Sequence, residues 1–412
     1  MSQVQLNSNA NSALQNTLMA SQSMVNPSVY STMPIYPATS LGFFTIEKSS
    51  GSVASSSQMS FNIPKYGIIE QILVTVQKNW ATAGTRNILM QDVYACIDRV
   101  ELLSSSRVIS TLTSADLLAQ LSDLEVSQFG AVQNGGVVET NPATSHITTF
   151  PLVFGFMEAI NTQLNASFLE PMTLRISWGD LSRFNGTSTG TGDAAPGTIT
   201  VGEPKLIIRY KNYDEEQNAS LLSQNYDQPE LNVVTTRWYD ENPDVFTQSG
   251  GGAATSHTFS IQLKNTDCVE SFYLMVRQMA TPANAIVPIF CEITSVKFTA
   301  SGQEILSLTG KELAYSKLTD EGWSTSSSSD QNLFAKKVLK IQMGCYGYGK
   351  LSNSLSLREL NNPLIEVTAT LQGGASAGTS DGARYEFDCA EKCVAIYSTS
   401  SSTGRQNLAL SN

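Results

Sequence analysis

Two segments of the chain, about 200 residues apart, contain the same succession of apolar, charged and helix-capping residues. In the first, Val100-Glu-Leu-Leu precedes the helix start Thr113-Ser-Ala-Asp116; in the second, Val296-Lys-Phe-Thr precedes Thr309-Gly-Lys-Glu312 at the same spacing. An internal repeat of this size means that one fold occurs twice in the chain. The repeat therefore limits the architecture more than any other feature of the sequence.

The flanking sequence extends the match on both sides. Upstream, the matched positions are Met59, Phe61, Ile63 and Glu70 in the first copy and Phe259, Ile261, Leu263 and Glu270 in the second. Downstream, residues 164–171 correspond to residues 355–363, and each stretch leads into an alternating run. The sequence therefore predicts two units in one register, with Glu70 opposite Glu270 and Val100 opposite Val296. We expect an N-terminal arm at 1–40, a first unit at 41–227 and a second at 228–412.

Apolar residues alternate with polar ones along most of both units, which is typical of half-buried strands. The clearest further runs centre on Val74, Leu174, Ile208 and Val367, and Gly/Ser/Thr-rich stretches separate the runs. Long helices are scarce, and the better candidate is 117–124, after the capping signal at Thr113. The pattern predicts an all-β protein of two tandem eight-stranded jelly-roll sandwiches.

Composition excludes several functions. Charged residues make up 15% of the chain, against about 25% in an ordinary globular protein, and the formal net charge is −11. Without a basic stripe, the chain is unsuited to bind nucleic acid through phosphates, and we expect no sequence-specific nucleic-acid partner. The two histidines, His146 and His257, have no neighbouring ligand residues at metal spacing. We therefore predict no catalytic residue, no cofactor site and no metal site.

Two acidic groups leave alternatives open. Asp214-Glu215-Glu216, and Asp240-Glu241 with Asp244, could form a general acid/base pair or a calcium site, but we favour solvated residues where the two units join. Trp238 and Tyr239 could form a sugar-binding platform, although packing at the junction between units is the preferred interpretation.

Six cysteines are dispersed along the chain, and no secretory segment opens the given sequence. We expect all six thiols to be reduced. Cys96 and Cys291 have apolar neighbours, so we predict that both are buried in strands that correspond between the units.

The N-terminal arm has no charged residue before Glu47. Leu6, Leu14 and Leu18, together with Ala10, are spaced so that a helix would place them along one stripe. Such a stripe is too weakly apolar to anchor alone in a bilayer, and an isolated helix of this length is marginal in water. We expect the arm to act in assembly, against the inner side of a shell or a neighbouring subunit.

The tandem repeat, the polar loops, the strand-like run 206–213 that closes the first unit and the uncharged arm resemble a double jelly-roll major capsid protein. This family occurs in tectiviruses, adenoviruses and related icosahedral DNA viruses. The resemblance implies a structural function without catalysis, in which three copies form a pseudo-hexameric homotrimeric capsomer and capsomers tile an icosahedral shell. Duplication agrees with this function, because three copies then present six similar sandwiches.

The same resemblance implies the partners and the location. The partners would be further copies of the chain, neighbouring capsomers, minor capsid and vertex proteins and, as in several such families, an internal viral membrane. The location would be the virion, with synthesis and assembly in the host-cell interior. Two alternatives remain: a minor capsid or spike protein, and a tandem carbohydrate-binding adhesin, which should expose aromatic clusters at its loop tips.

Overall fold

The structure is a computed structural model of the 412-residue chain. The structure describes residues 40–47, 53–80, 88–105, 107–123, 137–139, 145–157, 164, 166, 169–181, 199–202, 204–212, 230–248, 255–279, 289–309, 312–313, 338–343, 354–371, 384–401 and 406–411. Leu6, Leu14 and Leu18 of the predicted arm lie outside these ranges.

The first sandwich consists of two antiparallel sheets. One contains β1 (Ser40–Glu47), β11 (Lys205–Asn212), β3 (Ile68–Trp80) and β8 (Ser145–Leu152) in that spatial order, with β10 (Ile199–Val201) also beside β3. The other contains β2 (Gln58–Ile63), β9 (Met172–Trp178), β5 (Ile97–Ser104) and β6 (Arg107–Thr113). Short strands β4 (Ile88–Leu89) and β7 (Val137–Glu139) pair separately.

The second sandwich repeats this order. Its first sheet contains β12 (Glu230–Asp240), β22 (Arg384–Ser401), β15 (Cys268–Met279) and β19 (Val338–Gln342). Two short strands, β16 (Ile289–Phe290) and β20 (Leu355–Ser356), also pair with β15. Two others, β13 (Asp244–Thr247) and β23 (Gln406–Ser411), pair with β22. Its second sheet contains β14 (Thr255–Gln262), β21 (Leu364–Leu371), β17 (Glu292–Ala300) and β18 (Gln303–Thr309).

Counting the eight main strands of each unit in chain order, both units have sheets with the order 1-8-3-6 and 2-7-4-5. This is the eight-stranded jelly roll, made of nested Greek-key connections. The predicted all-β fold of two tandem jelly-roll sandwiches is confirmed.

Strand pairing confirms the predicted repeat register. One row of cross-strand neighbours runs through Leu112, Val100, Ile176 and Met59, and the matching row runs through Leu308, Val296, Val367 and Phe259. The β-bulges correspond as well. The register of β3 against β11 skips Glu70, and the register of β15 against β22 skips Glu270.

The alternating runs form the cores as the sequence predicts. In β2 and in β9, every second residue is buried, and β14 and β21 repeat this pattern across the second core. Helix α4 (Ser114–Asp123) follows β6 as the capping signal indicates, and α3 (Met90–Ala95) precedes β5. Short 3-10 helices occur at η1 (Gly155–Met157) and η4 (Leu357–Glu359).

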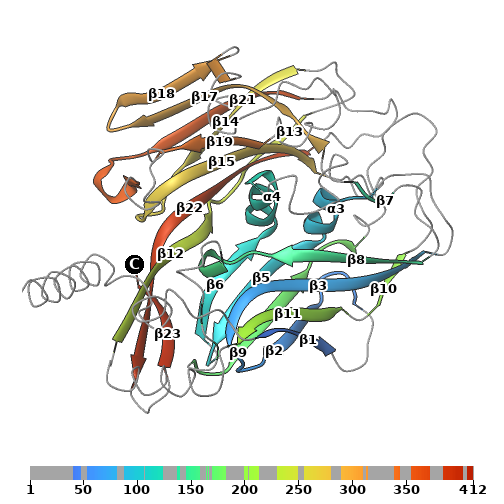
Figure 1. Ribbon diagram of the computed structural model, residues 1–412. Coiled ribbons are helices and arrows are strands. Elements are labelled where there is room, and N and C mark those ends of the chain that lie inside the picture. Colours follow the sequence, from blue (N-terminus) through green and yellow to red (C-terminus); the bar gives the residue numbers. More distant parts are fainter. Residues whose placement is uncertain are drawn as a thin grey trace, which may run out of the picture.

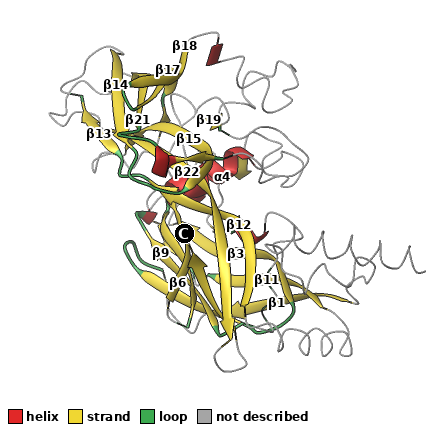
Figure 2. Ribbon diagram, turned by 90° about the vertical axis from the view of Figure 1, so that its left-hand side faces the viewer, coloured by secondary structure: helices red, strands yellow, loops and turns green. Residues whose placement is uncertain are grey.

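The two sandwiches are stacked, with α3 and α4 of the first between the main bodies of the two (Figure 1). After a quarter turn, α4 again lies beneath β15 and β22 of the second sandwich (Figure 2). The lower ends of β12 and β22, with β23, extend down beside the first sandwich, where β12 and β23 contact β6. The junction therefore involves helices from one unit and a sheet from the other.

Candidate functional site

At the junction between the sandwiches, the outer face of the sheet that contains β15 packs against the first sandwich. Residues of β15 point alternately to the two sides: Phe272 and Leu274 into the core of the second sandwich, Tyr273 and Met275 into the apolar cluster of the first. Phe290, Val338 and Ala390 join the same first cluster. Burying a side chain of this size contributes about 2 kcal/mol, so the two units pack as one body.

Strand β12 completes this contact. Trp238 packs against Tyr273 with ring centroids 5.1 Å apart and belongs to the apolar cluster of the first sandwich. The preferred interpretation of Trp238 as a junction residue is thus confirmed. Nearby, η1 approaches β12 so closely that a Cβ atom on Gly155 would lie 1.8 Å from the backbone oxygen of Thr236. Only glycine fits at that position of the junction.

Polar groups meet at the same junction, at the start of α4. The amide of Thr113 donates to Asp116 (2.8 Å), and the amide of Asp116 donates to the Thr113 hydroxyl (3.2 Å), which forms the predicted capping box. The Thr113 hydroxyl in turn donates to Asp240 of β12 (3.2 Å), so the cap of the first unit binds the second. Thr309 and Glu312 repeat the first of these bonds at 3.1 Å.

A buried ion pair lies beside these carboxyl groups. Arg277 of β15 binds Asp388 of β22, with 2.7 Å between Nε and Oδ2. Burial, and then the charge of Asp388, raise the pKa of Asp116 to about 7. Burial, and then the charges of Asp116 and Asp388, raise the pKa of Asp240 to about 9. Of the three carboxyl groups at the junction, Asp388 is the one that binds the guanidinium.

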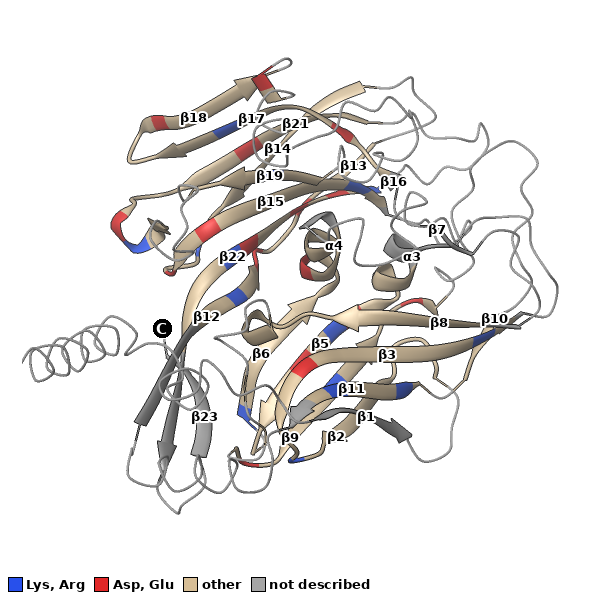
Figure 3. Cartoon of the chain, viewed as in Figure 1, with Lys and Arg blue, Asp and Glu red and all other residues tan. Residues whose placement is uncertain are grey.

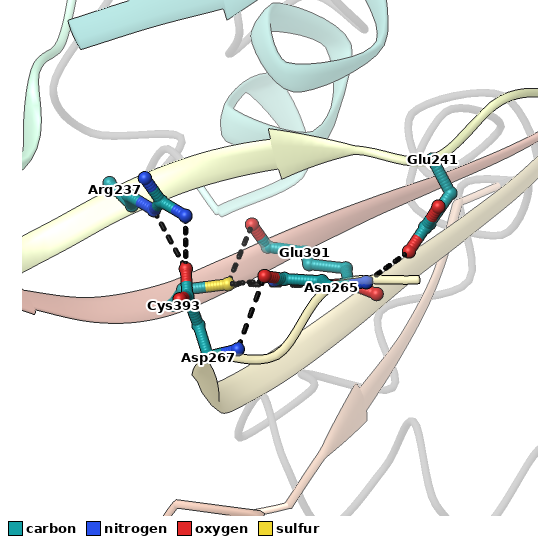
Figure 4. Close-up of polar contacts among 6 residues, drawn as sticks. All are labelled: Arg237, Glu241, Asn265, Asp267, Glu391 and Cys393. Carbon is teal, nitrogen blue, oxygen red and sulfur yellow. Dashed lines mark hydrogen bonds and ion pairs between the residues drawn. The ribbon is translucent and has the colours of Figure 1, made fainter. Parts of the chain in front are cut away.

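A second network fixes the turn between β14 and β15 (Figure 4). One carboxylate oxygen of Glu241 accepts hydrogen bonds from the backbone amides of Lys264 (2.5 Å) and Asn265 (2.9 Å). The Asn265 side chain donates to Glu391 (2.6 Å) and to the sulfur of Cys393 (3.1 Å).

The network also contains the ion pair between Arg237 and Asp267, and the Asp267 amide donates to the Asn265 side-chain oxygen (3.2 Å). Burial raises the pKa of Glu391 to about 8 and raises the pKa of the Cys393 thiol. These groups bond to one another and to backbone, which is the arrangement of a structural network.

The prediction of a solvated acidic hinge was wrong for two residues. Glu241 is 2% exposed and Asp240 is largely buried by α4 and β22. Asp240 is bonded to Thr113 of the first sandwich, and Glu241 is bonded to the backbone of the turn between β14 and β15, so neither faces water. Asp244 accepts a hydrogen bond from the Ser260 amide (2.9 Å), while Asp214, Glu215 and Glu216 lie outside the described ranges.

The described cysteines, Cys96, Cys268, Cys291, Cys389 and Cys393, are all free. Cys96 and Cys291 are fully buried and lie one residue apart in the repeat register, within the predicted margin, but each lies immediately before its strand and not within it. In both units the strand begins one residue later, where cross-strand pairing starts.

The described residues contain neither a metal-binding cluster nor a membrane-spanning helix. In this part of the chain, no group of three or more His, Cys, Asp or Glu residues could hold a metal ion. No helix in it is long and apolar enough to cross a membrane. Charged residues occur singly and with both signs along the strands that Figure 3 shows, without a gathered basic patch on them.

The two sandwiches differ in which of their equivalent surfaces are covered. Tyr273 and Met275 of β15 are fully buried, whereas Leu73 and Thr75, at the same positions of β3, are only half-buried. The opposite holds at the edge strands. Ile109 of β6 is 1% exposed, whereas Ile305, its equivalent in β18, is 43% exposed. In the first unit the edge strand β6 is covered and the face of β3 is more exposed. In the second unit the face of β15 is covered and the edge strand β18 is exposed.

Comparisons with known proteins identify the fold. No protein-family model and no curated protein matches the sequence. Among solved structures, the PBCV-1 capsid protein VP54, fitted into a reconstruction of the virophage Sputnik, has a TM-score of 0.64 at 14% identity over 92% of this chain and 98% of that chain. The Faustovirus major capsid protein has a TM-score of 0.56 at 12% identity over 88% and 90%.

The mavirus major capsid protein is similar over 90% of this chain and 91% of that chain, with a TM-score of 0.50 at 14% identity. At identities this low, the likeness establishes architecture. The chain has the double jelly-roll fold of these proteins along nearly its whole length.

Proposed function

We propose that this chain is a major capsid protein whose copies associate as a homotrimeric, pseudo-hexameric capsomer that tiles an icosahedral shell. The proposal includes the division into an arm at 1–40 and sandwiches at 41–227 and 228–412. It also includes a non-enzymatic function and a location in the virion. Neighbouring capsomers and minor capsid and vertex proteins are the partners proposed with it.

The observation that carries the proposal is the unequal burial of repeated surfaces. Within one chain, the helix-bearing edge of the first sandwich covers the outer face of β15 in the second. The equivalent edge of the second sandwich, at β18, and the equivalent face of the first, at β3, are left open. Within the chain, the first sandwich's edge packs on the second sandwich's β15 face. The open edge at β18 and the open face at β3 are the repeat equivalents of those two surfaces.

A second copy can supply the missing partner for each surface. Such a contact is heterologous, because different surfaces meet, and heterologous contacts close into a ring when the rotation between copies allows it. Three copies would give a ring of six sandwiches with six similar contacts. Three is the number of copies that the resemblance to double jelly-roll major capsid proteins implies.

The first test is the mass of the purified protein. Size-exclusion chromatography with light scattering should give three times the 44.5 kDa chain mass. A stable monomer at micromolar concentration would contradict the capsomer proposal.

A charge placed on the open edge should prevent this association. We expect Ile305→Glu to reduce the trimer fraction at least about tenfold, because a buried unpaired carboxylate costs several kcal/mol. Val108→Glu is the matched control: Val108 is 41% exposed on β6, and a glutamate, Glu304, already occupies its equivalent position. Equal masses for the two variants would show that β18 is not an association surface.

The arm is tested by deletion. Removing residues 1–40 should change the thermal unfolding midpoint by less than about 2 °C, because we assign the arm no part in either core, while the yield of shells falls. Electron microscopy of assembly reactions measures the yield. Normal shells from the truncated chain would make the arm dispensable, and a large fall in the midpoint would make it part of the core.

A further inference from the structure

The carboxyl groups at the junction between the sandwiches lie where the two units must separate if the chain opens. Asp116 is on α4 of the first unit, and Asp240 is on β12 of the second. Thr113 links them, since its hydroxyl accepts from the Asp116 amide and donates to Asp240. In each aspartate the other carboxyl oxygen, Oδ1, is buried without a hydrogen-bond partner.

Titratable groups on β15, β22 and α3 surround this pair. Strand β15 supplies Arg277, and β22 supplies Asp388, Glu386 and Cys389. Helix α3 supplies Tyr94. Its hydroxyl donates to the Pro151 carbonyl (2.9 Å) and is therefore not bonded to either carboxyl group. Because Arg277 is already bound to Asp388, it does not neutralise two further carboxylates.

We propose that the junction is a proton-linked contact: Asp116 and Asp240 are protonated while the sandwiches are packed, and their ionisation above neutral pH loosens the first unit from the second. The Asp116 and Asp240 carboxyl groups can be buried with Oδ1 unpartnered while they are neutral. As carboxylates, they would have to lose their hydration beside each other and beside Asp388. The inference concerns a single chain and does not depend on the capsomer.

The direction of the pH effect follows from linkage. In the folded chain, the pKa values of Asp116 and Asp240 are raised to about 7 and about 9. An acid whose folded pKa is raised contributes stability that is complete below its unfolded pKa, near 4, and is lost as pH rises through the folded value. The junction should therefore be firmest in mild acid and weakest near pH 9.

The test compares wild type with Asp240→Asn, which keeps the shape and removes the titration. Between pH 5 and pH 9, the wild-type midpoint should fall by at least about 4 °C more than that of the variant. Asp116→Asn should behave in the same way. Asp98→Asn, which removes an exposed acid from the same sandwich, is the control and should retain the wild-type pH dependence.

Hydrogen exchange locates the effect at the junction. After correction for the chemical rate, exchange in α4 should rise about tenfold from pH 6 to pH 9 in wild type, while exchange in β9, inside the first core, should not. Asp240→Asn should abolish the rise. The proposal is overturned if both aspartate variants keep the wild-type pH dependence, if Asp98→Asn loses it too, or if α4 and β9 respond alike.

Discussion

Replacing Gly155 with alanine should lower the free energy of unfolding by about 3 kcal/mol. The added Cβ would lie 1.8 Å from the Thr236 oxygen and 2.6 Å from its carbonyl carbon, and both are backbone atoms that cannot rotate away. To remove the clash, η1 must move from β12, and that movement opens the apolar contact around Trp238. Urea denaturation followed by circular dichroism measures the loss.

Gly179→Ala provides the matched control. A Cβ at Gly179 would find its nearest neighbour, the Cys96 oxygen, at 3.6 Å, which is an ordinary contact distance. Its effect should stay within about 1 kcal/mol, because the change then acts mainly on the unfolded chain. Similar losses for the two variants would mean that the close approach at the junction is not what requires glycine.

The second large effect is expected at Arg277. Replacing it with methionine should cost about 3–5 kcal/mol, because Asp388 would be left as a buried, unpaired carboxylate. Both side chains are nearly inaccessible, at 6% and 4% exposure, so water cannot replace the lost partner. The same urea measurement applies, at pH 7.

A double variant separates charge from packing. Arg277→Met combined with Asp388→Leu removes both charges and keeps apolar volume, so its stability should lie within about 1 kcal/mol of wild type. If the single variant costs less than about 1 kcal/mol, or if the double variant costs as much as the single one, an unpaired Asp388 is not the cause.

Several parts of the fold could be predicted from sequence because they depend on local pattern. Alternation placed Phe61 and Val367 in cores, and the Thr113–Asp116 spacing located a helix start. The repeat predicted that Glu70 and Glu270 would correspond, although nothing in the residues announced that both sit at a bulge. The capping and alternation rules operate over a few residues, so a single sequence contains them in full.

The junction could be predicted only in part. Trp238 was assigned to it, but Asp240 and Glu241 were expected to be solvated, and Arg277 and Gly155 were not singled out. One signal was present: the run Phe272–Val276 is apolar at every position, whereas the equivalent stretch of β3 contains the polar Thr75. Continuous apolar runs indicate strands buried on both faces.

Periodicity and spacing are properties of the chain, and they define the strands, the duplication and the register of the two copies. Which copy of each repeated surface is covered depends on how the two sandwiches pack. Ile109 and Ile305 are the same residue type at equivalent positions, yet one is buried and the other exposed, because only β6 has β12 and β23 against it. Burial of that kind depends on the neighbour that a surface meets, and local sequence does not specify the neighbour.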